Sequence, residues 1–160
     1  MNAPSLGNCF IRKQYRKKVM GKIMNPYIHK VHYYETDKMG IVHHSNYIRW
    51  MEEARIDFLS QIGWDFDKLE EMGIISPVLA VECRYKEVTR FPEEIQIDVF
   101  VKEFKGVRLI LGYNMRKKGE ENVVTVGTTE HAFLDENYRP LRLKKTHPEF
   151  CQALMDMVVE

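Results

Sequence analysis

The segment NYIRWMEEARIDFLSQI, residues 46–62, decides the fold that we predict for this chain. Its apolar side chains recur at spacings of three and four, which is the period of an α-helix. The stripe consists of Tyr47, Met51, Ala54, Phe58 and Ile62, and it is widened by Ile48, Trp50 and Leu59. A helix with so broad an apolar face is buried against other elements. Ser45 or Asn46 can cap its start and Gly63 follows its end, so both boundaries are marked.

Strand patterns surround this helix. Residues 27–35, before it, are rich in aromatic and β-branched side chains, which favours a strand. A short second helix fits residues 65–72. Four further strand patterns follow, over residues 78–85, 94–104, 107–116 and 122–134. Their short links favour an antiparallel meander, and a short C-terminal helix is expected after Pro148. The predicted fold class is therefore α+β, with the helices on one face of an antiparallel sheet.

Length, charge and cysteine content narrow the class of protein. A chain of 160 residues is one ordinary domain, and its net charge of +1 does not suit a nucleic-acid binder. Its three cysteines are too few and too widely spaced for a disulfide framework, so we expect a reducing, cytoplasmic setting. No apolar run approaches the roughly 18–20 residues that span a membrane.

The first 24 residues differ from the rest. They carry basic side chains and no acidic residue: Arg12, Lys13, Arg16, Lys17, Lys18 and Lys22. No apolar stretch follows them, so they do not form a secretory signal. We interpret residues 1–24 as a basic extension, either a disordered or transit-like tail or a stretch upstream of a true start at Met20 or Met24. The single domain is expected over residues 25–160.

The loop before the long helix concentrates the groups that can carry chemistry. Residues 34–47 read YETDKMGIVHHSNY. A helix N-terminus offers free N–H groups and partial positive charge, which can stabilise a negative charge developing on a carbonyl. Asp37, on the same loop, could attack that carbonyl or deprotonate a water. An equally open interpretation is that Asp37 caps the turn and Gly40 supplies a positive φ.

This stretch resembles the signature of the 4-hydroxybenzoyl-CoA thioesterase family of hotdog proteins, which includes the short-chain acyl-CoA thioesterases of bacterial Tol–Pal operons. The matching positions are Asp37, Gly40, Ile41, Val42, His43, His44, Asn46 and Tyr47, followed on the helix by Glu52, Ala54 and Arg55. The resemblance continues through Arg90-Phe91-Pro92 and covers roughly residues 27–145, so motif, order of elements and length agree.

The resemblance implies a hotdog fold, in which a five-stranded antiparallel sheet wraps a long central helix. It also implies an acyl-CoA thioesterase that works as a homodimer or homotetramer, with active sites between subunits. Asp37 would be the nucleophile or general base, a backbone N–H near His44 would polarise the thioester carbonyl, and the His44 ring would assist. We expect Gly40, Val42, Asn46 and Tyr47 to line the substrate site. No cofactor is expected, because CoA is part of the substrate.

Some residues keep two interpretations. Tyr47 could donate a hydrogen bond in the pocket or pack in the core, and Glu52 and Arg55 could pair with each other or with a partner subunit. A metal site among the histidines is not expected, because His29 and His32 would point to opposite faces of a strand. The CoA phosphates need cations, for which the sequence offers Arg84, Arg90, Arg142 and Lys144, with Lys86 and Lys145 as further candidates.

Two other functions remain open from the sequence. A hotdog hydratase or dehydratase would use a histidine with a carboxylate in an Asp-x-Asn-Pro-x-His motif, and the Asn-Pro is missing between Asp37 and His43. A non-catalytic module would bind acyl-CoA or a protein partner without turnover. The intact Asp37 and Gly40 favour the enzyme.

Overall fold

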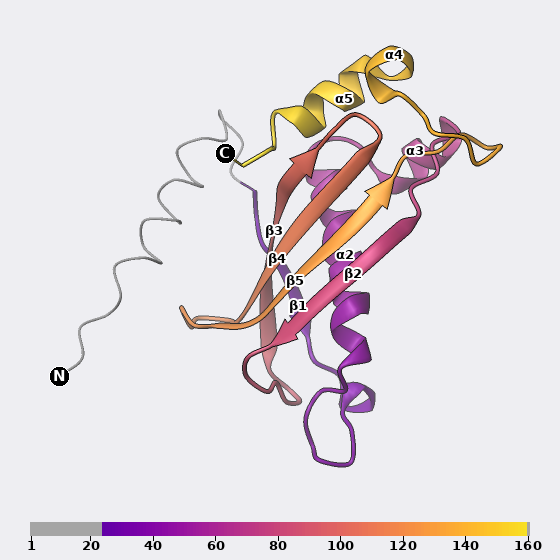
Figure 1. The fold of residues 1–160 in the computed structure, drawn as a ribbon. Coiled ribbons are helices and arrows are strands. Elements are labelled where there is room, and N and C mark those ends of the chain that lie inside the picture. Colours follow the sequence, from indigo (N-terminus) through magenta and orange to yellow (C-terminus); the bar gives the residue numbers. More distant parts are fainter. Residues whose placement is uncertain (1–23, 160) are drawn as a thin grey trace.

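The computed structural model describes residues 24–159. Five strands form one antiparallel sheet in the order β1-β3-β4-β5-β2. The strands are β1 (Tyr27–Lys30), β2 (Val78–Tyr85), β3 (Glu94–Phe104), β4 (Arg108–Lys117) and β5 (Val123–Ala132). The 17-residue helix α2 (Ser45–Gln61) runs along one face of this sheet, as Figure 1 shows. The predicted α+β class is confirmed, and the long helix lies within one residue of its predicted bounds.

The core forms between α2 and the sheet because both carry apolar side chains at the right period. On β3, the alternate residues Ile95, Ile97, Val99 and Val101 are buried, while Gln96, Asp98 and Phe100 lie on the opposite face. On α2, the residues that face the sheet include Trp50, Met51 and Phe58. None of the helices within residues 24–159 has the length and hydropathy needed to cross a membrane.

The first predicted strand is shorter than expected. β1 ends at Lys30, and Tyr33–Glu35 form a short 3-10 helix, η1, instead of continuing the strand to Glu35. The reason is tertiary: the Glu35 carboxylate turns back to accept the His32 N–H at 2.7 Å and the Trp50 Nε1–H at 2.8 Å. These bonds compete with strand geometry, which the aromatic composition alone had favoured.

The strand order also differs from a simple meander. β3, β4 and β5 are consecutive neighbours, but β2 pairs with β5 and not with β3. Both edges of β3 are already paired, with β1 and β4, and β2 pairs with the remaining edge of β5. β2 is therefore an edge strand. Its side chains are exposed on both faces of the sheet, apart from the half-buried Cys83.

The remaining helices lie away from the N-terminus of α2. α3 (Phe66–Glu71) follows the long helix as predicted. A further short helix, α4 (Leu143–Thr146), was not predicted. The predicted C-terminal helix, α5 (Pro148–Met155), follows it, with His147 as the N-cap residue. In Figure 1, α4 and α5 lie at one end of the molecule and the loop that precedes α2 lies at the other. The basic extension predicted for residues 1–24 lies outside the described residues, except for Met24.

Candidate active site

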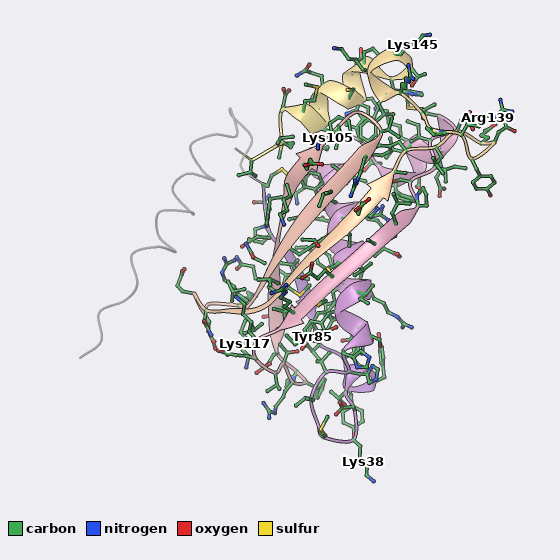
Figure 2. All side chains as sticks on the ribbon, in the orientation of Figure 1. Lys38, Tyr85, Lys105, Lys117, Arg139 and Lys145 are labelled. Carbon is green, nitrogen blue, oxygen red and sulfur yellow. The ribbon has the colours of Figure 1, made fainter. Side chains whose placement is uncertain are left out.

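The loop of residues 36–44 is closed by its own backbone. Thr36 and Val42 form an isolated β-bridge, and the Asp37 N–H donates to the Ile41 oxygen at 2.8 Å. The Gly40 N–H donates to the Asp37 oxygen at 3.0 Å, and Gly40 has a φ of +74°, which favours glycine. The positive φ expected at Gly40 is confirmed. Lys38 marks the tip of this loop in Figure 2.

The Asp37 side chain is half-buried and has two differently occupied oxygens. Oδ1 accepts the Met39 N–H at 2.8 Å, which is the turn-capping contact that the sequence left open. Oδ2 accepts no hydrogen bond from any residue between 24 and 159. Capping and reactivity are therefore compatible, since one oxygen holds the turn and the other is available.

Helix α2 begins immediately after the loop. His44 is its N-cap residue, and the His44 side chain does not cap the helix. The His43 ring is tied to Ser45, with Nδ1 2.8 Å from Oγ, and the exposed His44 ring lies 4.1 Å from it, centroid to centroid. The Tyr85 hydroxyl, on edge strand β2, donates to the His44 backbone oxygen at 2.9 Å. The N-terminus of α2, where the helix dipole places a partial positive charge, thus follows Asp37 by only a few residues.

The four predicted substrate-binding residues support the loop in the single chain. Val42, Asn46 and Tyr47 are buried. The Asn46 amide donates to the Glu35 backbone oxygen at 2.8 Å, and the Tyr47 hydroxyl lies 2.6 Å from the Thr89 hydroxyl. Tyr47 is therefore a core residue with a satisfied hydroxyl. Contact of these residues with a substrate stays a prediction.

The predicted CoA-binding cations are not brought together by one chain. Arg90 is exposed and follows Thr89, whose backbone oxygen accepts the Val42 N–H at 2.9 Å, so it lies beside the loop. Arg84 is exposed on β2 and pairs with Glu82 at 2.8 Å. Arg142 and Lys144 belong to the α4 end, which Lys145 marks in Figure 2, opposite Lys38. These four assignments stay predictions.

Two hollows of the described chain lie away from Asp37. One, of about 380 Å³, involves strands β2 to β5 and is lined in part by Glu82, Arg84 and Lys102. Another, of about 510 Å³, lies between β1, α2 and the start of α3, and half of its lining residues are acidic. Neither is lined by Asp37, so the volume of a substrate pocket does not come from these hollows. Within residues 24–159 no cluster of His, Cys, Asp or Glu could hold a metal ion.

Comparison with known proteins decides the family. The model of the thioesterase-like superfamily matches residues 31–154, which includes the loop, α2 and the whole sheet after β1. The chain belongs to this superfamily. At the level of the family, its activity is thioester hydrolysis.

Particular relatives agree with this membership. A putative acyl-CoA thioesterase of Bacillus subtilis, YneP, is 30% identical over 125 residues, which are 78% of this chain and 90% of the relative. The 1,4-dihydroxy-2-naphthoyl-CoA hydrolase of Thermosynechococcus vestitus is 26% identical, over 72% of this chain and 83% of its own. The solved DHNA-CoA thioesterase of Staphylococcus aureus superposes with a TM-score of 0.77 at 31% identity, covering 82% of this chain and 88% of its own. This superposition confirms the predicted hotdog fold.

The sequence did not indicate the role of Glu35, which directly precedes the loop of residues 36–44. Glu35 was assigned to a strand, yet its buried carboxylate accepts hydrogen bonds from His29, His32 and Trp50. Burial alone raises the pKa of Glu35, but these three hydrogen bonds outweigh it and hold the pKa below its ordinary value. Its position two residues before Asp37 was the only signal in the sequence.

Arg55 has a partner that the sequence did not indicate. Its Nη1 donates to His131 Nδ1 at 3.1 Å, and no ion pair joins it to Glu52 within residues 24–159. Its guanidinium also lies over the Phe66 ring, 5.5 Å from the centroid. Arg55 is therefore a buried cation of the thioesterase core, held by a neutral imidazole.

Proposed function

We propose that this chain hydrolyses an acyl-CoA thioester to a free acid and CoA, with Asp37 as the catalytic carboxylate. The observation that carries the proposal is the position of Asp37, on a closed loop that leads directly into the N-terminus of α2, with Oδ2 unoccupied by described residues. The names of the relatives from Bacillus subtilis, Thermosynechococcus vestitus and Staphylococcus aureus, which are all CoA thioesterases or hydrolases, support the substrate class.

The reaction breaks the bond between the thioester carbonyl carbon and sulfur. Either Asp37 attacks the carbonyl and forms a mixed anhydride that water hydrolyses, or it takes a proton from the water that attacks directly. In both routes the carbonyl oxygen becomes negative, and backbone N–H groups at the start of α2 stabilise it. The oxygen of water ends on the acid, and CoA leaves as the thiol. His44 positions the water or passes the proton.

A second copy of the chain completes the proposed enzyme, as a homodimer or a homotetramer. Edge strand β2 exposes apolar side chains, with Leu79 at 54%, and its outer edge pairs with no other strand within residues 24–159. A long, exposed apolar edge strand is a pairing surface. Tyr85, on this strand, contacts the His44 oxygen, so a copy paired along β2 would border the site. The free thiols of Cys83 and Cys151 support a reducing, cytoplasmic setting.

The test is release of free thiol from acetyl-, hexanoyl-, palmitoyl- and 4-hydroxybenzoyl-CoA. In Asp37→Asn, the amide oxygen can still accept the Met39 N–H, so the turn survives while the charge is lost. We expect kcat to fall by roughly 100-fold or more, on the scale of a lost acid–base or nucleophilic group. Asp135→Asn is the matched control, since Asp135 Oδ1 accepts the Asn137 N–H at 2.8 Å in a similar turn.

Wild-type hydrolysis that disappears in Asp37→Asn and persists in Asp135→Asn supports the proposal. Equal activity of wild type and Asp37→Asn on every substrate contradicts the role of Asp37. Absence of thiol release from wild type contradicts acyl-CoA hydrolysis. A change in enoyl-CoA absorbance without free thiol would then assign a hydratase.

A further inference from the structure

Glu35 joins the separate elements that surround the Asp37 loop. It is only 6% exposed, and its carboxylate accepts three hydrogen bonds. They come from the His29 ring on β1 at 2.9 Å, from the His32 N–H at 2.7 Å and from the Trp50 indole on α2 at 2.8 Å. A buried carboxylate with three donors is fixed in place, because moving it would leave a charge unsatisfied.

The backbone of the same residue holds the far side of the loop. The Glu35 carbonyl oxygen accepts the His43 N–H at 2.9 Å and the Asn46 amide at 2.8 Å. Glu35 therefore directly precedes the loop that carries Asp37, and its backbone also binds the residues that end this loop. A second hydrogen bond holds the end of the loop: the Val42 N–H donates to the Thr89 oxygen at 2.9 Å.

His29 is the side chain from β1 that binds this carboxylate. Its Nε2 lies 2.9 Å from Glu35 Oε2, and its Nδ1 lies 3.2 Å from Glu53 Oε2, which also accepts the Tyr27 hydroxyl at 2.8 Å. Both ring nitrogens of His29 therefore face carboxylate oxygens, one from Glu35 and one from Glu53. The other groups that face this ring are Trp50, at 4.5 Å between centroids, and the edge of His32, at 5.7 Å.

We propose that Glu35, hydrogen-bonded to His29, is the positioning residue of the candidate active site. It fixes the Asp37 loop against the N-terminus of α2 without touching the substrate. This inference rests on the proposed function of Asp37. A displacement of about 1 Å at a reacting group can cost about 100-fold in rate, so a loop anchor acts on kcat more than on substrate binding.

The first test replaces the anchor with an uncharged side chain of similar size. In Glu35→Gln, the amide can no longer accept from His29, His32 and Trp50 together. We expect kcat to fall by about 10-fold or more while KM changes by less than about 3-fold. Amide hydrogen exchange at Val42 and His43 should rise by about 10-fold, because the side chain of residue 35 no longer holds the loop in place, although the backbone acceptors of both N–H groups remain. If Glu35→Gln does not fold, His29→Gln is measured instead, and we expect shifts in the same direction.

Two matched variants separate positioning from general stability. Glu53→Gln alters the other carboxylate on His29, but its amide oxygen still accepts from Nδ1 and it does not contact the loop, so we expect wild-type kcat and exchange. Ile97→Val lowers stability from a buried site on β3 and should leave loop exchange unchanged.

The outcomes distinguish the two proposals. Faster loop exchange with lower kcat in Glu35→Gln, and neither effect in the controls, supports positioning by Glu35. Wild-type loop exchange in Glu35→Gln, or equal effects in Ile97→Val, overturns it. If the wild type releases no thiol, the proposed function has failed, and the exchange rates alone decide whether Glu35 anchors the loop.

Discussion

His131 is a buried histidine whose neighbours keep it neutral. It accepts from Arg55 at Nδ1, and its Nε2 donates to the Thr129 hydroxyl at 2.8 Å. That hydroxyl also contacts the Tyr113 hydroxyl at 2.8 Å, so the network is satisfied. Burial, and then the adjacent Arg55 cation, lower the pKa of His131 from 6.5 to about 3.

This histidine predicts acid lability. Between pH 6.5 and 3 the unfolded chain binds a proton at His131 and the folded chain does not, so stability falls as the pH drops. From pH 7 to pH 5 its contribution to the loss is roughly 2 kcal/mol. His131→Asn keeps an acceptor for Arg55 but cannot titrate. We expect its unfolding free energy, from urea titrations, to fall less than that of wild type over this range.

The compared quantity is the change of unfolding free energy with pH. Any stability that His131→Asn loses at pH 7 therefore does not affect the comparison. His32→Asn, at an exposed histidine, is the control and should keep the wild-type slope. Equal slopes for wild type and His131→Asn would contradict the buried, neutral assignment.

At the scale of elements, Gly127 marks a close approach of α2 to the sheet. It lies on β5 beneath the helix, and a Cβ there would lie 2.5 Å from Met51 Sδ and 3.2 Å from the Glu82 oxygen. No side chain fits between these elements, because the interior is close-packed. A methyl group at residue 127 would therefore displace the buried Met51 side chain.

Gly127→Ala should destabilise the protein by roughly 1–3 kcal/mol, the usual cost of overpacking a core. Adding Met51→Ala removes the clashing sulfur, so the double variant should lose less stability than the sum of the two single variants. Thr128→Ala, one residue further along β5, is the control and should have a smaller effect. Strict additivity in urea unfolding would show that the two residues do not share this contact.

At the scale of the whole molecule, β2 and β1 are the two edges of the sheet and offer a matched pair of sites. Val81 on β2 and Ile28 on β1 are both 39% exposed. We expect wild type to sediment as a multiple of its 19.0 kDa chain, and Val81→Lys to dissociate it, because a charged side chain on an edge strand blocks pairing. Thiol release should fall together with the mass.

Ile28→Lys introduces the same charge at the other edge and should keep the wild-type mass and activity. A monomeric wild type, or equal dissociation by both variants, would contradict assembly through β2. Sedimentation velocity over a range of protein concentrations makes the measurement.

The sequence by itself determined the features that depend on local periodicity and local backbone chemistry. The spacing of apolar residues located α2 to within one residue, and the alternation along Ile95, Ile97 and Val99 located β3. The order of Asp37 and Gly40 before a helix start located the candidate site and the positive φ. These signals lie within a few residues of one another, so they can be interpreted without the fold.

The tertiary structure decided everything that depends on partners distant in the chain. β2 joined β5, while β1 and β4 pair with the two edges of β3, and Glu35 left the strand because Trp50 and His29 bind its carboxylate. Arg55 met His131, 76 residues away, where the sequence had left open a pairing with Glu52 or with a partner subunit. Such contacts follow from which faces and edges remain free once the sheet and helix have packed, and no local pattern in the sequence encodes that.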